Sequence, residues 1–209
     1  MKILSFNINN DYRFIPEKAQ VVIDLMRDYN IDIVGLQEVT RALYNELESK
    51  LLDGYFMSSP SSSTFFNVII SKFSDNFIQT RFENTSMDRG YIIHETPTVC
   101  LINTHLESVA INQVIREKQC NEIKKKIEKD TIVFGDLNFC NAGETFDGLH
   151  YLMPKTEDVF SYDSLLNREA IPPFRSNLDR FYSNNEKVYE IRILKDVLLS
   201  DHFPLLLTI

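Results

Sequence analysis

The alternation of apolar and polar positions predicts a strand, a helix and a second strand at the start of the chain. Residues 2–8 and 31–38 are apolar runs of strand length, and residues 16–30 between them carry apolar side chains at helical spacing after Pro16. Since strand, helix and strand in this order form a crossover unit, we expect a parallel or mixed sheet.

The middle of the chain predicts one helix, four short strands and a long helix. Residues 40–52 are expected to be helical, and residues 58–64 form a serine-rich loop around a proline. The strands that follow are closely spaced, which favours an antiparallel meander; they span residues 65–70, 77–82, 91–93 and 99–103. A helix is expected over residues 111–129, and its apolar side would consist of Ile111, Val114, Ile115, Ile123 and Ile127.

The last third begins with a buried strand that breaks at a glycine. Residues 131–138 end in Gly135-Asp136-Leu137-Asn138, and residues 139–175 show little periodicity. Irregular segments of that length in compact domains are usually functional or disordered. Three final strands are expected, at residues 178–182, 188–193 and 203–209. We expect a mixed sheet within a single domain, residues 1–209.

Composition narrows the class of protein. The chain has 209 residues, is 44% hydrophobic, and contains only 6 glycines and 7 prolines, so it can bury one substantial core. It contains no apolar run of membrane-spanning length and no signal-peptide pattern at its start. We expect a soluble intracellular protein of the nucleus or cytoplasm, without membrane contact and with reduced cysteines.

The net charge of -8 argues against a broadly basic surface that binds long duplexes non-specifically. A small phosphate-binding cleft remains compatible with this charge, because carboxylates that hold a divalent cation count as negative until the cation is bound.

Asp136 and Asn138 form the most informative pair. Side chains two apart on an extended chain point the same way, so both would project from the C-terminal end of the strand at residues 131–138. A carboxylate can take a proton from water, and a nearby amide can orient that water or a phosphoryl oxygen. The same four residues are also good turn formers, so an ordinary turn is the alternative.

Other polar residues occupy similar positions at the ends of core strands; they are Asn7, Glu38, His105, Asp179, Asp201 and His202. Each has a structural alternative. Glu38 could begin the next helix, His105 could be a core histidine, and Asp179 could pair with Arg180. Asp201-His202 could be a strand-entry turn. Because strand ends at one sheet edge converge in space, the recurrence favours a shared site.

Together these motifs resemble the exonuclease-endonuclease-phosphatase superfamily, which has the DNase I-like fold. The matching segments are Ser5-Phe6-Asn7, Gln37-Glu38-Val39, Asn103-Thr104-His105, Gly135-Asp136-Leu137-Asn138, Leu178-Asp179-Arg180 and Ser200-Asp201-His202. Within it, the tyrosyl-DNA phosphodiesterase 2 branch is the most similar, because Ser108 follows His105-Leu106-Glu107, Arg116 and Gln119 lie further on, and Ser86-Met87-Asp88-Arg89-Gly90 also resembles that branch.

The resemblance implies an α/β fold: a four-layered sandwich of two mixed β-sheets flanked by helices. It also implies Mg²⁺ as cofactor, with Mn²⁺ as the alternative ion. The implied metal ligands are Glu38, Asp136 and Asp201. Asp136 would activate water, Asn7 and Asn138 would orient water and phosphoryl oxygens, His105 and His202 would contact the phosphate, and Asp179 would orient His202.

Substrate contacts are implied for Ser108 and Asn7, and stacking by Tyr162 or Phe65 would suit an unpaired base. The sequence departs from that branch in three ways. Val109 replaces an expected basic residue, Phe139-Cys140 replaces an expected arginine, and no tryptophan is present.

The expected function is hydrolysis of the 5'-phosphotyrosyl bond between a protein and a nucleic-acid 5' end, by a monomer. Such an enzyme would repair DNA. Two other enzyme classes of the superfamily are alternatives: a DNA or RNA nuclease, and an inositol or sphingolipid phosphatase. An inactive binding module is the non-enzymatic alternative.

Overall fold

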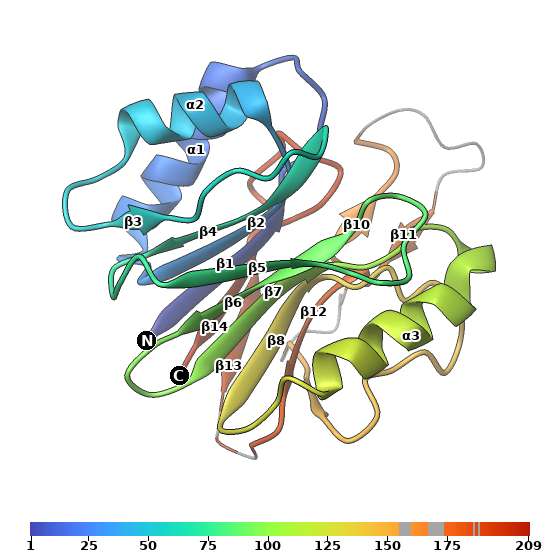
Figure 1. Cartoon of the computed structure of the whole chain (residues 1–209). Helices are drawn as coiled ribbons and strands as arrows, with labels where there is room; N and C mark the ends of the chain where they lie inside the picture. The colour runs from blue at the N-terminus through green and yellow to red at the C-terminus, as the bar shows by residue number, and fades with distance from the viewer. Residues whose placement is uncertain (155–159, 167–173, 186, 188) are drawn as a thin grey trace.

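Two six-stranded β-sheets pack face to face, and helices cover both outer faces (Figure 1). This arrangement comes from a computed structural model that describes residues 1–154, 160–166, 174–185, 187 and 189–209. Helices α1 (Ile15–Asp28) and α2 (Arg41–Lys50) cover one sheet, and α3 (Gln113–Lys124) covers the other. The predicted four-layered α/β sandwich is confirmed.

The first sheet has the strand order β13-β14-β1-β2-β4-β3. Its strands are β1 (Lys2–Asn7), β2 (Ile33–Thr40), β3 (Phe56–Met57), β4 (Phe65–Ser71), β13 (Glu190–Ile193) and β14 (Leu205–Thr208). β1 and β2 are parallel and joined through α1, as the sequence predicts. The predicted position of β4 was wrong, because β4 pairs with β2 and β3 rather than with the next strand of the chain.

The second sheet has the strand order β5-β6-β7-β8-β12-β9. Its strands are β5 (Phe77–Arg81), β6 (Gly90–Glu95), β7 (Cys100–His105), β8 (Thr131–Asp136), β9 (His150–Leu152) and β12 (Asp179–Ser183). The meander holds for β5, β6 and β7, and β7 is parallel to β8. The segment 139–175, expected to be irregular, contains β9 and a two-stranded pair, β10 (Tyr162–Asp163) with β11 (Arg175–Ser176). Residues 155–159 and 167–173 of that segment lie outside the described residues.

Apolar side chains fill three layers of core. One layer lies between α1, α2 and the first sheet, one between the two sheets, and one between the second sheet and α3. In the middle layer the rings of Phe134 and Phe181 stack with centroids 5.4 Å apart. This rigid centre fixes the strand ends that carry the polar residues.

The predicted apolar face of the long helix was wrong for Ile111 and Val114, while Ile123 is buried and Ile127 packs against the core as predicted. α3 ends at Lys124 rather than near residue 129, and a 3₁₀ turn, Ala110–Asn112, precedes it. Ile111 is 89% exposed and Val114 is 61% exposed. The buried face of α3 consists of Arg116, Gln119, Cys120 and Ile123. Polar side chains at helical spacing occupy this face because Arg116 and Gln119 hydrogen-bond the segment beneath it.

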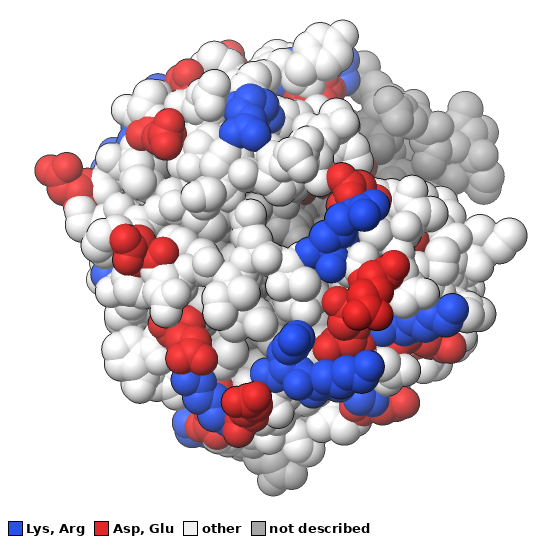
Figure 2. All heavy atoms as spheres, viewed as in Figure 1, with Lys and Arg blue, Asp and Glu red and all other residues white. Residues whose placement is uncertain are grey.

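Charges of both signs are mixed on the surface. On the face in Figure 2, Lys and Arg side chains alternate with Asp and Glu side chains, and much of the area carries neither. Within the described ranges, no helix combines the length and apolarity needed to cross a membrane. All three cysteines are free thiols; Cys100 and Cys120 are buried and Cys140 is exposed.

Candidate active site

Three strand ends bring Asn7, His105 and Asp136 into contact. Asn7 is the last residue of β1, His105 is the last residue of β7 and Asp136 is the last residue of β8. β7 and β8 are parallel neighbours. Asn7 Nδ2 donates to Asp136 Oδ2 at 2.9 Å, and His105 Nε2 lies 3.3 Å from the same oxygen. The predicted convergence of these three residues is therefore present.

Gly135 allows β7 and β8 to approach at this point. Its φ is +133°, and a Cβ there would lie 1.9 Å from the backbone oxygen of Thr104. An L side chain rarely adopts this conformation, and no side chain fits the space. His105 follows Thr104 in β7 and Asp136 follows Gly135 in β8, so His105 and Asp136 lie side by side.

Asn138 reaches the site through a turn and not along the strand. β8 ends at Asp136, and Asn138 has a φ of 51°, in the left-handed region. Its backbone N–H donates to Asp136 Oδ1 at 3.1 Å, and its Nδ2 donates to Leu106 O at 3.2 Å and Ser108 Oγ at 3.3 Å. The strand-alternation argument for Asn138 was thus wrong, while the turn brings Asn138 and Asp136 together.

His202 approaches Asp136 from the other side. Asp179, which begins β12 directly opposite Asp136, accepts a hydrogen bond from His202 Nδ1 at 2.7 Å. His202 Nε2 then lies 3.8 Å from Asp136 Oδ2. Burial lowers the pKa of His202, but the carboxylates of Asp179 and Asp136 outweigh it and raise that pKa to about 10. His202 is accordingly a cation that presents an Nε2–H.

The environment of Asp136 makes it more basic than an ordinary carboxylate. Burial raises its pKa to about 7, and the negative charges of Asp179 and Glu38 add to this, against the opposing effects of His202 and the Asn7 hydrogen bond. A base with a pKa near neutral pH is well matched to proton abstraction. A bound divalent cation would lower this value.

His105 is neutral and carries its ring proton on Nε2. Burial, together with the cations Arg89 and His202, lowers its pKa well below 6.5. Arg89 Nη1 lies 3.0 Å from His105 Nδ1, and since a guanidinium only donates, Nδ1 must accept. The ring proton is therefore on Nε2. This buried atom has no hydrogen-bond partner among the described residues, so it is not a satisfied core histidine.

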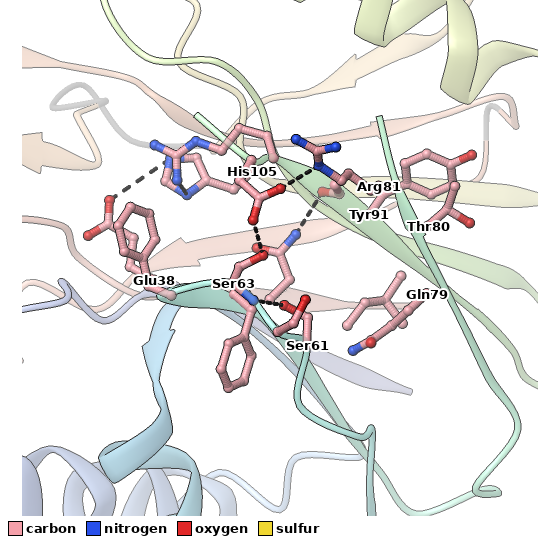
Figure 3. A pocket seen from close by; sticks show the side chains of 16 residues that line it. Glu38, Ser61, Ser63, Gln79, Thr80, Arg81, Tyr91 and His105 are labelled. Atoms are coloured by element: carbon pink, nitrogen blue, oxygen red, sulfur yellow. Dashed lines mark hydrogen bonds and ion pairs between the residues drawn. The ribbon is translucent and has the colours of Figure 1, made fainter. Parts of the chain in front are cut away.

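Glu38 faces the same space from β2. The pairing of β2 with β4 shifts register between Leu36 and Val39, and Glu38 within this bulge has a φ of 59°. Glu38 Oε2 accepts from Asn10 N at 3.0 Å, and Oε1 lies 4.0 Å from His105 Nε2 (Figure 3). The alternative of a helix-starting acid fails, because Thr40 caps α2.

The carboxylates of Glu38 and Asp136 suit a hard divalent cation. Both lie within 4.0 Å of the unpartnered His105 Nε2, and Mg²⁺ prefers oxygen ligands and few protein carboxylates. Asp136, Asp179 and His202 also lie close enough to share an ion. That second set fits less well, since His202 is cationic and its Nδ1 is bound to Asp179. Asp201, the third predicted ligand, accepts from Asn9 Nδ2 at 2.9 Å, beside the loop after β1.

Arg89 is a site residue that was not among the predicted ones. Its Nη2 donates to Ser108 Oγ at 2.9 Å, while Nη1 binds His105. The buried carboxylate of Glu107 holds the segment before Arg89, accepting from Met87 N at 2.8 Å and from Gln119 Nε2 at 3.1 Å. The segment 86–90 carries a family resemblance, but nothing in its local sequence pattern indicates a contact with His105.

Two aromatic residues flank the site. The Tyr162 ring lies edge-on to His202, with centroids 4.9 Å apart. Phe65 lies under the guanidinium of Arg89, 5.2 Å from its carbon, and lines a pocket of about 250 Å³. Figure 3 shows this pocket running from Glu38 and His105 toward Gln79 and Arg81. Both aromatic residues predicted to contact a substrate therefore lie adjacent to the site, and the contact itself stays a prediction.

Two known proteins are similar to this chain in sequence. The chain is 27% identical to human Tyrosyl-DNA phosphodiesterase 2 over 150 residues, which is 65% of this chain and 41% of the relative. It is 23% identical to the Xenopus tropicalis Tyrosyl-DNA phosphodiesterase 2 over 203 residues, 86% of this chain and 54% of the relative. The chain thus spans about half the length of these relatives.

Solved structures share the fold. A D. rerio TDP2 complexed with single strand DNA product superposes with a TM-score of 0.83 at 21% identity, covering 99% of this chain and 97% of that one. Staphylococcus aureus beta toxin superposes with a TM-score of 0.77 at 17% identity, covering 100% and 99%. The family model described as the Endonuclease/Exonuclease/phosphatase family matches residues 4–202, and the chain belongs to that family.

Proposed function

We propose that the chain is a magnesium-dependent phosphodiesterase that hydrolyses the bond between a protein tyrosine and a nucleic-acid 5' phosphate. The observation that carries this proposal is the buried Asp136 carboxylate, which lies between a neutral donor, His105, and a cationic donor, His202. The products would be a protein with a free tyrosine hydroxyl and a nucleic acid with a 5'-phosphate, as expected of a DNA repair enzyme.

Asp136 would accept a proton from the attacking water. Its two oxygens are held by Asn7 Nδ2 and by the backbone N–H of Asn138, so the carboxylate has one orientation. A fixed base needs no reorganisation when the proton moves, which lowers the barrier relative to a mobile one.

Three donors would stabilise the charge that develops on the phosphoryl oxygens. His105 and His202 each present an Nε2–H toward the space beside Asp136. Ser108 Oγ accepts from both Arg89 and Asn138, which leaves its own proton to donate. Asp179 would keep His202 oriented and protonated.

Glu38 and Asp136 would hold Mg²⁺, and Mn²⁺ would suit the same oxygen ligands. The ion would supply charge neutralisation at the phosphoryl and leaving oxygens. Asp201 would support this site through Asn9 and the loop after β1.

The tyrosine leaving group reduces the stabilisation that the site must supply to the leaving oxygen. A tyrosine phenol has a pKa of about 10, whereas water has a pKa of about 15.7, so a phenolate leaves more readily than an alkoxide. One metal and a well-oriented base would then suffice. Tyr162 or Phe65 would stack an unpaired base near the 5' end, since stacking tolerates any base.

The test is hydrolysis of an oligonucleotide with a 5'-phosphotyrosine, beside one with a plain 5'-phosphate, with and without Mg²⁺. The wild type should release tyrosine and leave a 5'-phosphate, and EDTA should stop the reaction. Asp136→Asn should lose the activity, whereas Asp75→Asn, which changes an exposed carboxylate between β4 and β5, should keep it.

Two outcomes would contradict the proposal. Internal cutting without tyrosine release would favour a nuclease. No turnover of either substrate would favour a lipid phosphatase or a binding module. Hydrolysis of phosphoinositides in vesicles would then distinguish the phosphatase from the binding module.

A further inference from the structure

A buried amide of the second sheet binds the irregular part of the first sheet that carries Glu38. Asn103 lies in β7 and is completely buried between the two sheets. Buried amides are stable only when their hydrogen bonds are made, so the partners of Asn103 indicate its role.

The three side-chain hydrogen bonds that Asn103 makes to described residues all go to the bulge in β2 and to its neighbour β4. Asn103 Nδ2 donates to Leu36 O at 3.1 Å and to Val68 O at 3.0 Å. Leu36 and Val68 are the last regular pair of β2 and β4 before the register shifts. Asn103 Oδ1 accepts from Gln37 Nε2 at 2.7 Å, and Gln37 immediately precedes Glu38. One amide therefore binds both strands and the first bulged residue.

Gly35 gives Asn103 the room to make these contacts. A Cβ on Gly35 would lie 3.0 Å from Asn103 Cγ and 2.2 Å from Phe134 Cε2. A larger residue would push the two sheets apart at this point. The close approach of the two sheets at Gly35 thus allows the Asn103 amide to reach the bulge.

The direction of Glu38 depends on the bulge. In a regular strand, side chains alternate between faces, so loss of the extra residue would turn Glu38 away. A φ of 59° is also uncommon for a residue other than glycine and persists only where the surroundings impose it. With the bulge in place, the Glu38 carboxylate meets Asn10 N and faces His105.

We propose that Asn103, assisted by Gln37, is a positioning residue that keeps Glu38 turned toward the metal-binding space; this inference rests on the proposed function. Asn103 touches neither substrate nor metal, and acts through the backbone of β2. Its loss should therefore change metal binding and the local conformation of Glu38, beyond any change in stability.

The experiment compares the wild-type chain with Asn103→Leu, which keeps the number and branching of the side-chain heavy atoms and removes the hydrogen bonds. Mn²⁺ binding is measured by electron paramagnetic resonance, and hydrogen exchange of the Asn10 amide, the donor to Glu38, is measured by NMR. Asn103→Leu should bind Mn²⁺ at least about tenfold more weakly, as for other residues that orient a metal ligand. Its Asn10 amide should exchange faster.

The matched control is Leu101→Val, on the same strand and in the core between the sheets. It removes buried volume and leaves the three hydrogen bonds of Asn103 to the bulge in place, so it should keep the wild-type Mn²⁺ affinity and Asn10 exchange. If Asn103→Leu does not fold, Gln37→Met replaces it; it removes the donor to Asn103 Oδ1 and should change both readouts in the same direction.

Wild-type Mn²⁺ affinity and wild-type Asn10 exchange in the folded variant would overturn the inference. If the wild type itself binds no Mn²⁺, the Asn10 exchange alone decides. A wild type that does not cleave the tyrosyl oligonucleotide, while Asn103→Leu still loses Mn²⁺ affinity, would refute the proposed function and leave the role of Asn103 standing.

Discussion

Replacing Gly135 with alanine should destabilise the protein severely and disrupt the site. The new Cβ would lie 1.9 Å from the Thr104 oxygen, which belongs to the backbone of the paired strand β7. A backbone atom in a sheet cannot rotate aside as a side chain can. Either β7 and β8 separate or the φ of +133° changes, and both alter the positions of His105 and Asp136.

The magnitude follows from two separate costs. Holding a residue with a Cβ in this backbone region costs about 1–3 kcal/mol. Forcing extra volume into a packed region costs about 1–3 kcal/mol more. Taken together, the free energy of unfolding should fall by about 4 kcal/mol, which for a domain of this size corresponds to a Tm lower by roughly 10 °C.

Urea unfolding followed by circular dichroism measures this loss, and Gly143→Ala is the control. Gly143 also has a positive φ, +85°, but nothing lies within 4 Å of a Cβ built there. The control should lose about 1 kcal/mol, from backbone strain alone. If Gly135→Ala lost no more stability than Gly143→Ala, the argument from close strand approach would be refuted.

Three further predictions concern charge and metal. Asp179→Asn removes a carboxylate that raises the pKa of His202, so His202 should lose its positive charge at a lower pH than in the wild type. The kcat should therefore fall about 100-fold at pH 8 and less at pH 6. A loss of kcat that does not depend on pH would contradict this prediction. Burial lowers the pKa of His94 below 6.5, so His94 binds a proton more readily in the unfolded chain than in the folded one. The free energy of unfolding should therefore fall as the pH drops below 6.5. His94→Gln should reduce that fall between pH 7 and 5 in urea unfolding, and an unchanged pH dependence would count against it. Glu38→Gln should raise the Mg²⁺ concentration for half-maximal activity at least about tenfold, and a wild-type Mg²⁺ titration would exclude Glu38 as a ligand.

The strand ends of the site could be predicted because their signal is local. Asn7, His105 and Asp136 each follow an apolar run of the sequence. Parallel pairing of β1 with β2 in the first sheet and of β7 with β8 in the second aligns strand ends within each sheet, and the packing of the two sheets brings Asn7 to Asp136. The sequence pattern predicted the apolar runs and the crossover from β1 through α1 to β2.

Other features depend on contacts between distant segments. β4 joins β2 rather than β5, and the spacing of strands along the chain does not determine that choice. Arg116 has the pattern of a solvated helix residue, yet it is buried because Glu144 and the backbone at Glu107 receive its hydrogen bonds. Arg89 reaches His105 only through the path of its loop. Strands of two or three residues, such as β10, are too short to show a period.

The contact between Arg89 and His105 has a consequence for proton movement. An arginine keeps its charge throughout the accessible pH range and offers no acceptor. His105 Nδ1 therefore remains occupied by a donor, and the ring cannot receive a proton at one nitrogen while releasing it from the other. His105 is fixed as a one-way hydrogen-bond donor, so the proton taken from water must leave the site by way of Asp136 and not through a histidine relay on the β7 side.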